Sequence, residues 1–435
     1  METHPSQSPD PYQYPRTQPR STLYRVWVDG RPVEVLHTAV ADFAAFDCNG
    51  PAEITVEVKA PEPLTAAVVR PLGRGITAVW EGRTVRFATS QPQNLCLEIP
   101  GHPELFIYAN PPEKNRPSPD DPKVRFFRAG QIYEAGEIEL KSGETLYIEA
   151  GAVLKGCVRA NGARDLRICG RGVLDGSFYR YDQGERIQSI LLERCQQVTV
   201  EDIIMIEPTA WMLVLGLCAG VHVRNLKQIG QVISSDGIDV CGSKEVLIED
   251  CCLRNNDDNV VIKAFGRWQA DVENVRVRRC VLWNASAGNA MEIGHELMTE
   301  RVHDIVFEDI DVLCVHGHGA AFSIHNSDRA TVENVRWENI RVEHYFDKLI
   351  DFRVFASRWS GGTERGRIRH IHLKNIRVIN SIYNPGYSVS VISGFSPSAP
   401  VEDVRMEDFY LGDKKITNAD QLDLHTRNVT GVRFH

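Results

Sequence analysis

The sequence predicts an all-β protein: a right-handed parallel β-helix of about ten coils, preceded by a small N-terminal β-sandwich. Two observations carry this prediction. One short strand-like unit recurs roughly every 30 residues between Val198 and Phe409, and no helical 3.6-residue pattern lies between its copies. Before residue 111, alternating strands are separated by tight turns, which is typical of an antiparallel sandwich.

Four segments follow one another along the chain. Residues 1–21 are rich in proline and poor in apolar residues, so we expect a disordered tail or an extended arm. Residues 22–110 contain the strands of the sandwich, among them LYRVWVDG and TVRFAT. Residues 111–122, PPEKNRPSPDDP, form a proline-rich linker, and residues 123–435 form the parallel β-helix domain, which is expected to be catalytic.

The repeated unit has the form V-x-Φ-x-[D/N/R/C]-Φ, where Φ is apolar. Its alternation is that of a strand, so the copies are expected to stack as parallel strands. The variable distance between copies indicates loops of variable length at one corner of the coil, where binding clefts are usually built. The copies are VTVEDI (198–203), VHVRNL (221–226), VLIEDC (246–251), VRVRRC (275–280), IVFEDI (305–310), VRWENI (335–340), IHLKNI (371–376) and VRMEDF (404–409).

A second strand in each coil carries ionisable residues on one face. If Ile238, Val260 and Met291 point into the core, period-two alternation turns their neighbours outward. We expect these neighbours to form a column that grips a ligand, although a merely solvated face would give the same pattern. The column contains Asp239, Lys263, Glu292, Ser323, His325, Asp351 and Arg353.

Three carboxylates converge in two adjacent coils. SSDGIDV and NNDDNVVIK place Asp236, Asp257 and Asp258 at the start of neighbouring strands. Like charges this close raise at least one pKa, so one carboxyl can act as general acid while another remains a base. Glycosidic bond cleavage needs such a pair. Turn capping by single aspartates and a Ca²⁺ site are the competing interpretations.

These segments resemble the polygalacturonase family, glycoside hydrolase family 28. The resemblance is carried by ILLERCQQVTVEDI (190–203), EPTAWMLVLGLCAGVHVRNL (207–226), SSDGIDVCGSKEVLIEDCCLRNNDDNVVIKA (234–264) and GNAMEIGHE (288–296). It implies inverting hydrolysis without metal or organic cofactor. By position, Asp257 would be the general acid, and Asp236 and Asp258 would hold and activate the water.

Two departures from the family pattern bear on the substrate. The family's Gly-His-Gly is here Gly288-Asn289-Ala290, and its Arg-Ile-Lys aligns with Ser323-Ile324-His325. Carboxylates are recognised by Arg or Lys, so a substrate other than plain homogalacturonan is expected, such as a neutral sugar. The residues expected to bind it are Asp239, Lys263, Glu292, His325 and Arg353, with Trp211 as a stacking platform or a core aromatic.

Composition limits the partners. Asp and Glu (58) outnumber Lys and Arg (49), a net charge of −9, which disfavours nucleic acid. No apolar stretch approaches the ~20 residues of a membrane span. We see no secretory signal, and eleven cysteines suit a reducing compartment, so a cytoplasmic location is expected. The cysteines are interpreted as stacked buried thiols and His316 and His318 as loop residues without a third metal ligand.

The leading hypothesis is therefore a glycoside hydrolase acting on an oligosaccharide or polysaccharide. A polysaccharide lyase or sugar transferase on the same fold is a second class, and a non-catalytic carbohydrate-binding β-helix is a third. The oligomeric state stays open, with a homo-oligomer as one option. The N-terminal sandwich is expected to pack against the rod and cover its first coils.

Overall fold

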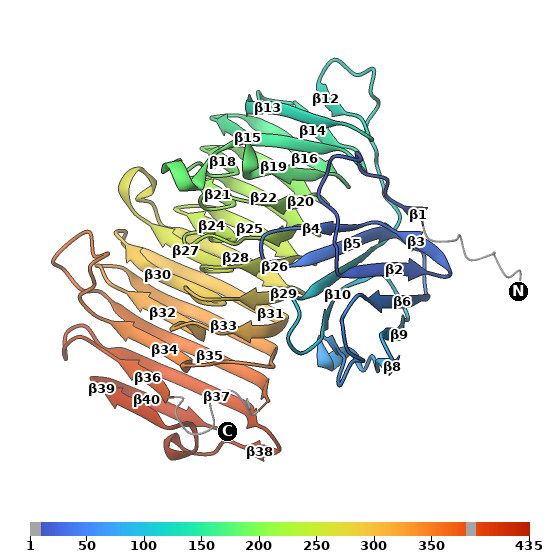
Figure 1. Cartoon of the computed structure of the whole chain (residues 1–435). Coiled ribbons are helices and arrows are strands. Elements are labelled where there is room, and N and C mark those ends of the chain that lie inside the picture. The colour runs from blue at the N-terminus through green and yellow to red at the C-terminus, as the bar shows by residue number, and fades with distance from the viewer. Residues whose placement is uncertain (1–9, 380–388) are drawn as a thin grey trace, which may run out of the picture.

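The computed structural model describes residues 10–379 and 389–435, and it confirms the predicted fold class. A large parallel sheet coils into a rod, and two smaller sheets at the N-terminus form a sandwich beside it (Figure 1). In the described part of the chain, no helix has the length and apolar character that crossing a membrane requires.

The strands of the rod stack in three ladders. The first ladder carries the repeated unit, and its strands are β12 (Val124–Phe127), β14 (Thr145–Ile148), β16 (Arg164–Gly170), β19 (Gln196–Glu201), β22 (Ala219–Arg224), β25 (Lys244–Glu249), β28 (Val272–Arg278), β31 (Arg301–Val315), β33 (Thr331–Val342), β35 (Arg367–Val378), β37 (Val401–Leu411) and β40 (Val429–Phe434). A short strand β38 (Lys414–Lys415) pairs antiparallel with β37.

The second ladder underlies the cavity described below. It consists of β13 (Ile132–Glu139), β15 (Val153–Asn161), β18 (Ile190–Glu193), β21 (Leu213–Gly216), β24 (Ile238–Cys241), β27 (Val260–Ala264), β30 (Met291–Leu297), β32 (Ala320–Asn326), β34 (Lys348–Val354), β36 (Val389–Ser393) and β39 (Leu424–Arg427). The third ladder uses parts of β13, β15, β31, β33, β35 and β37 together with β17 (Val173–Asp175), β20 (Ile204–Ile206), β23 (Lys227–Ile229), β26 (Cys252–Asn255) and β29 (Val281–Asn284). Short 3₁₀ turns are η1 (Leu72–Arg74), η2 (Gly176–Phe178), η3 (Tyr181–Gln183), η4 (Gly266–Trp268) and η5 (Ala419–Leu422).

The fifth position of each repeat turns the chain from the first ladder into the third. At all eight positions the backbone is left-handed, with φ between 50° and 73°. Asn and Asp tolerate this conformation better than other side-chain-bearing residues, which explains why they dominate the position. Arg279 is the one residue of another type. The eight residues are Asp202, Asn225, Asp250, Arg279, Asp309, Asn339, Asn375 and Asp408.

The interior of the rod is a continuous apolar core. Inward residues of successive coils lie in register, as in the pair Ile238 and Val260. Near the C-terminal coils, Trp337 stacks between Phe307 and Phe352, with ring centroids 5.6 and 5.3 Å away. All eleven cysteines lie among the described residues; each is buried and none forms a disulfide. Burial of these aligned side chains is the main stabilising term of the rod.

The N-terminal domain has two sheets. One contains β1 (Asp10–Pro11), β5 (Asp42–Asp47), β11 (Leu105–Asn110), β10 (Gln93–Glu98), β7 (Val68–Arg70) and β4 (Val35–His37); the other contains β3 (Arg31–Val33), β2 (Tyr24–Val28), β6 (Ala52–Val58), β9 (Thr84–Thr89) and β8 (Val79–Glu81). The expectation of a wholly antiparallel sandwich is wrong at one place: β5 and β11 pair in parallel. The chain between them crosses through the other sheet, and such a crossover permits a parallel pair.

The sandwich lies along the side of the rod, against its third ladder (Figure 1). Phe106 and Tyr108 of β11 share an apolar cluster with Ile206 and Trp283. The same cluster includes Val153 and Val173 of the early coils, so the N-terminal residues cover a flank of the first coils, as the sequence suggested, and of the middle coils as well. Residues 10–21 pass along its edge, with β1 paired to β5 and Tyr12 buried; residues 1–9 lie outside the described part.

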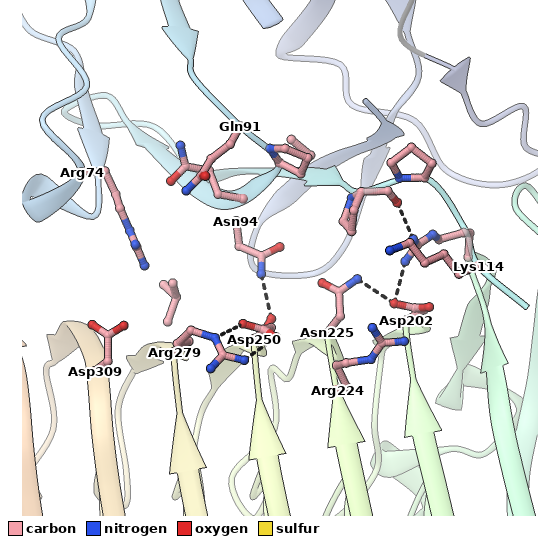
Figure 2. A pocket seen from close by; sticks show the side chains of 17 residues that line it. Arg74, Gln91, Asn94, Lys114, Asp202, Arg224, Asn225, Asp250, Arg279 and Asp309 are labelled. Carbon is pink, nitrogen blue, oxygen red and sulfur yellow. Dashed lines mark hydrogen bonds and ion pairs between the residues drawn. The ribbon is translucent and has the colours of Figure 1, made fainter. Parts of the chain in front are cut away.

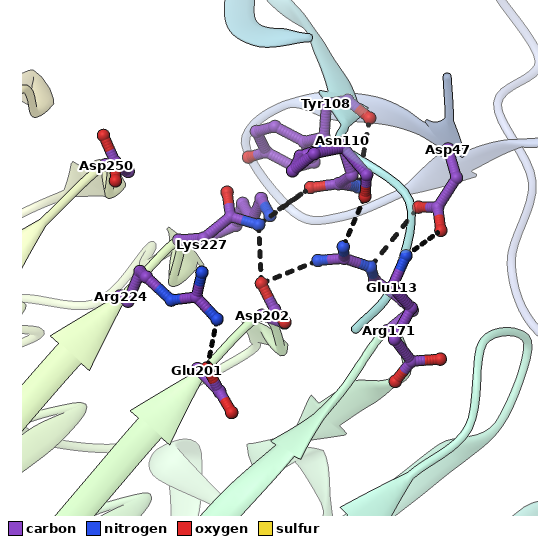
Figure 3. Close-up of polar contacts among 12 residues, drawn as sticks. Asp47, Tyr108, Asn110, Glu113, Arg171, Glu201, Asp202, Arg224, Lys227 and Asp250 are labelled. Atoms are coloured by element: carbon purple, nitrogen blue, oxygen red, sulfur yellow. Dashed lines mark hydrogen bonds and ion pairs between the residues drawn. The ribbon is translucent and has the colours of Figure 1, made fainter. Parts of the chain in front are cut away.

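Polar contacts also join the two domains (Figure 3). Arg171 forms ion pairs with Asp202 of the rod at 2.7 Å and with Asp47 of the sandwich at 3.3 Å. The buried Lys227 donates a hydrogen bond to Asn110. The expected linker takes part as well, because the carbonyl of Pro111 accepts from Arg171 at 2.6 Å. Burial lowers the pKa of Lys227 to about 7.

The left-handed corner faces a cavity of about 400 Å³ between the domains (Figure 2). Asn94 of the sandwich reaches across and donates to the carbonyl of Asp250 at 3.2 Å. Some of the charges beside it are paired within the rod, as Arg279 with Asp250 at 2.7 Å, and others across the two domains, as Arg74 with Asp311 at 2.9 Å. This cavity is an interdomain space and holds none of the residues predicted to form the catalytic or the binding site.

Candidate active site

A separate, open cavity of about 640 Å³ lies where the chain enters the second ladder. It brings together most of the predicted site residues. Those that line it are Trp211, Asp236, Asp257, Asp258, Lys263, His325 and Arg353. Its wall also contains residues that were not predicted, namely Asn289, His295, Glu296, His318, Lys348, Arg358 and Trp359.

The three aspartates converge at the floor of this cavity. Asp236 precedes β24, and Asp257 and Asp258 precede β27 in the next coil. One carboxylate oxygen of each lies within 4.8 Å of one oxygen of both others. Asp236 and Asp258 are almost fully buried, whereas Asp257 is only partly covered. The spacing of one coil therefore does bring these carboxylates into a single cluster.

Backbone and side-chain donors fix each carboxylate. Asp257 accepts from the backbone N–H of Ser234 and of Asp258, both at 3.0 Å. Asp258 accepts from the backbone N–H of Asn289 at 2.6 Å and from its side-chain amide at 3.0 Å. Asn289, at the family's histidine position, is thus a direct partner of the cluster. Gly288 has to be glycine, because its φ is +70° and a Cβ would collide with the backbone N of Asp258.

The cluster retains protons that ordinary carboxyls lose. Burial raises the pKa of Asp257 to about 6, with a further contribution from the charge of Asp236. Burial, and next the charge of Asp257, holds the pKa of Asp258 well above its usual range. The protonation of Asp257 and of Asp258 is coupled, since a charge on one disfavours a charge on the other. The arrangement can therefore offer a proton and a carboxylate at the same time.

Lys263 offsets the charge of Asp236, which belongs to the cluster, and of Asp239, which does not. Its ammonium donates to Asp236 at 2.8 Å and to Asp239 at 2.9 Å. Burial alone would lower its pKa, but these two carboxylates outweigh burial and hold the pKa well above the usual value. The ammonium also lies 3.9 Å from the ring centre of Trp211, a cation–π contact. Lys263 is thus a fixed cation of the site with its donors engaged.

A buried ionic chain lies beneath the adjoining part of the floor. His325 contacts Glu292 at 2.9 Å through Nδ1 and Asp351 at 3.1 Å through Nε2. Arg353 completes the chain with two hydrogen bonds to Asp351, at 2.5 and 2.7 Å. Burial would lower the pKa of His325, but Glu292 and Asp351 raise it to about 10. The imidazole is therefore held as a cation between two carboxylates.

Two predicted substrate-binding residues do not reach the cavity. Asp239 and Glu292 are 0% exposed and do not line the cavity. The period-two alternation correctly predicted that both side chains point away from the apolar core of the rod. Paired side chains of neighbouring coils, Lys263 and His325, lie against them and replace solvent. A role for Asp239 and Glu292 in gripping sugar hydroxyls is thus corrected to support of the cations above them.

The unpredicted wall residues come from loops. Trp359 is 51% exposed and lies in the segment between β34 and β35, with the Arg358 guanidinium 4.6 Å from its ring centre. His295 stacks on His325 at 4.5 Å, and burial, then the nearby cation, lowers its pKa to about 4. In the sequence, the only sign that Trp359 lies at the cavity was an aromatic residue next to an arginine in an otherwise polar insertion. The loop containing His318 gave no signal of its position.

Comparison with known proteins shows a similarity to one family of glycoside hydrolases. Residues 138–345 match the family described as glycosyl hydrolases family 28. The chain resembles this family over that segment, which is just under half of its 435 residues. Curated polygalacturonases from Chamaecyparis obtusa and Juniperus ashei are each 23% identical to the chain over 233 residues. The chain spans only 37% and 38% of the length of these two relatives.

Solved structures share the fold of this chain. Dex49A from Penicillium minioluteum superimposes with a TM-score of 0.73 at 13% identity, covering 98% of this chain and 96% of that one. A hyperthermoactive exopolygalacturonase from Thermotoga maritima has a TM-score of 0.56 at 18% identity, covering 71% and 84%. The first likeness takes in the N-terminal sandwich as well as the rod. At these identities the likeness is one of fold.

Proposed function

We propose that this protein is a glycoside hydrolase that cleaves glycosidic bonds in an oligosaccharide or polysaccharide. The observation that carries the proposal is the convergence of Asp236, Asp257 and Asp258 within 4.8 Å at the floor of an open cavity. Such a cluster supplies the proton donor and the base that glycoside hydrolysis needs. The family 28 match over residues 138–345 supports the same chemistry.

Asp257 is the proposed general acid. It is the least covered of the three aspartates, and its pKa of about 6 keeps a useful fraction protonated near neutral pH. Asp258 lies deeper, and both hydrogen bonds from Asn289 engage the same oxygen of its carboxyl group. A proton on Asp257 is therefore better placed for transfer to the leaving oxygen of a bound sugar.

Asp236 and Asp258 are the proposed water-holding pair. Their oxygens lie within 4.8 Å of each other, so one water molecule between them can donate a hydrogen bond of ordinary length to each carboxylate. Lys263 donates to Asp236 at 2.8 Å, and Asp236 is the proposed base that takes the proton of the water. The water then attacks the anomeric carbon while Asp257 protonates the departing oxygen.

We propose that the reaction inverts the anomeric configuration. The carboxylates lie closer than the roughly 6.5–9.5 Å typical of inverting enzymes, near the ~5–5.5 Å of retaining ones. Inversion is nevertheless favoured because Asp236 and Asp258 are both bound to protein donors and act better as a water clamp than as a nucleophile. The resemblance to family 28 points to the same outcome.

An uncharged sugar is the proposed substrate. The two cations best placed to bind a sugar carboxylate are already committed, Lys263 to Asp236 and Asp239, and Arg353 to Asp351. The other cations of the cavity wall are engaged too: Lys348 pairs with Asp347 and donates to the carbonyl of His318, and the Arg358 guanidinium lies over the ring of Trp359. The aspartate cluster at the floor repels uronate groups. Trp211 and Trp359 offer aromatic surface at the wall, and sugar rings stack on such surface.

A panel of glycans of defined linkage, uncharged and uronic, tests the proposal. We expect new reducing ends from an uncharged glycan, unaffected by a chelator, and a loss of about 10²–10⁴-fold in the Asp257→Asn variant. Proton NMR of the first product should show the inverted anomer. Unsaturated products that need a divalent cation would instead identify a lyase, and unaltered glycans throughout would favour a binding protein.

A further inference from the structure

A thiol and two imidazoles meet at the end of β31, outside the catalytic cluster. Cys314, His316 and His344 each place one donor atom within 4.8 Å of the other two. Nδ1 of His316 lies 2.9 Å from Nε2 of His344. From the sequence, His316 and His318 were interpreted as loop residues without a third metal ligand. In the structure, His318 lines the catalytic cavity, and His344 of the next coil lies against His316.

The backbone holds these three residues in place. Cys314 and His316 are two residues apart on one chain segment, so their side chains leave it on the same side. The N–H of Val315 donates to the carbonyl of His344 at 3.0 Å, and the N–H of Phe346 donates to that of Val315 at 2.9 Å. The two segments therefore keep their register without help from the side chains, and the donor atoms are preorganised.

We propose that Cys314, His316 and His344 bind one zinc ion. Imidazole and thiolate are the ligands that zinc prefers, at about 2.0–2.1 Å for nitrogen and ~2.3 Å for sulfur. Tetrahedral ligation at these lengths separates ligand atoms by roughly 3.3–3.6 Å, so a small opening of the present cluster admits the ion. The set contains no carboxylate, which disfavours calcium and magnesium. His316 is exposed, and a water completes the fourth position from that side.

The ion would brace the wall of the catalytic cavity. His316 is followed directly by the segment of His318 and Gly319, which lines that cavity. Lys348, a few residues after His344, already donates to the carbonyl of His318 at 2.6 Å. Zinc would add a second tie between the same two loops. Its role is therefore structural, and the proposal does not depend on the proposed hydrolysis.

Metal titration of the full-length protein tests this site. The protein is treated with a chelator, dialysed and titrated with Co²⁺ and with Zn²⁺, alongside His316→Ala, Cys314→Ser and, as matched control, His318→Ala. His316→Ala is the decisive variant because this side chain is exposed and its removal spares the core. The readouts are metal per chain, the thiolate-to-cobalt absorption band and the melting temperature.

We expect one ion per chain, the thiolate band, and a higher melting temperature with Zn²⁺ in the wild type and in His318→Ala. Loss of an outer-shell partner typically weakens metal binding about 10–100-fold, so loss of a direct ligand in His316→Ala should weaken it more than about 100-fold. Cys314→Ser should lose the band. A wild type that retains no metal, or a His316→Ala variant that binds as the wild type does, would overturn the proposal.

Discussion

At the residue scale, function rests on how neighbours alter a few ionisable groups. Asp257 shares the cavity floor with Asp236, and burial together with that charge makes it a weaker acid than a free aspartate. Lys263 acts in the opposite direction, since it offsets the charge of Asp236 and Asp239. The site is thus one partly neutralised cluster in which each group sets the protonation of the next.

The pH dependence of turnover follows from this cluster. A general acid must be protonated, and the pKa of Asp257 is about 6, so kcat/KM should fall as the pH rises through about 6. The loss should approach tenfold per pH unit. Initial rates on a cleavable glycan between pH 4 and 9 measure this limb. An activity that stays level from pH 5 to pH 8 would contradict the assignment of Asp257.

At the scale of elements, each strand of the first ladder from β16 to β40 also has a left-handed residue near its start. Glu245 in β25 has a φ of 54°, and the residue opposite it in the preceding coil is Gly220, with a φ of 68°. A left-handed backbone costs a side-chain-bearing residue roughly 1–2 kcal/mol, and glycine avoids this cost. The chain therefore carries strain at Glu245 that the neighbouring coil has removed.

Substitution at this corner should change stability in a predictable direction. Glu245→Gly should raise the free energy of unfolding by about 0.5–1 kcal/mol, after the entropic cost of glycine is deducted. Glu245→Val should lower it by about 1 kcal/mol, because β-branched residues fit this conformation worst. Denaturant unfolding of the three proteins provides the comparison. Equal stability of the glycine and valine variants would refute the strain argument.

The repeats predicted the rod because one strand pattern recurs with a turn residue at a fixed place. They also placed Asp236, Asp257 and Asp258 in adjacent coils, since stacking follows directly from the order of strands. The burial of Asp239 and Glu292 was not predictable, because it depends on which long side chains of neighbouring coils lie over them. The contact between His316 and His344 escaped prediction for a related reason. It depends on where two loops of unequal length end.

At the scale of the whole molecule, the sandwich and the rod are joined through buried polar groups. Lys227 lies fully buried at this junction, where it donates to Asn110 (Figure 3). Burial favours the neutral amine, and the pKa falls to about 7. In the unfolded chain an ordinary lysine keeps its proton to about pH 10.4. The unfolded state therefore binds more protons between these two pH values.

This difference predicts how stability responds to pH. Because the unfolded state holds the extra proton, Lys227 should make the native state more stable as the pH rises from 7 to 10, by up to about 1.4 kcal/mol per unit. Lys227→Met lacks this contribution. The free energy of unfolding of the variant minus that of the wild type should therefore decrease across this range, because only the wild type gains stability. A difference that is constant with pH would show that the amine keeps its proton when buried.

The claim that Asp257 is the proton donor is tested most directly by changing the leaving group. An aryl glycoside with a strongly acidic phenol departs without protonation, whereas a natural sugar leaving group needs it. The ratio of wild-type to Asp257→Asn rates should be about 10²–10⁴ on the natural glycan and fall close to one on the activated aryl glycoside. Asp236→Asn should be impaired on both substrates, because water activation is still required. An Asp257→Asn variant that is equally impaired on both substrates would contradict the account.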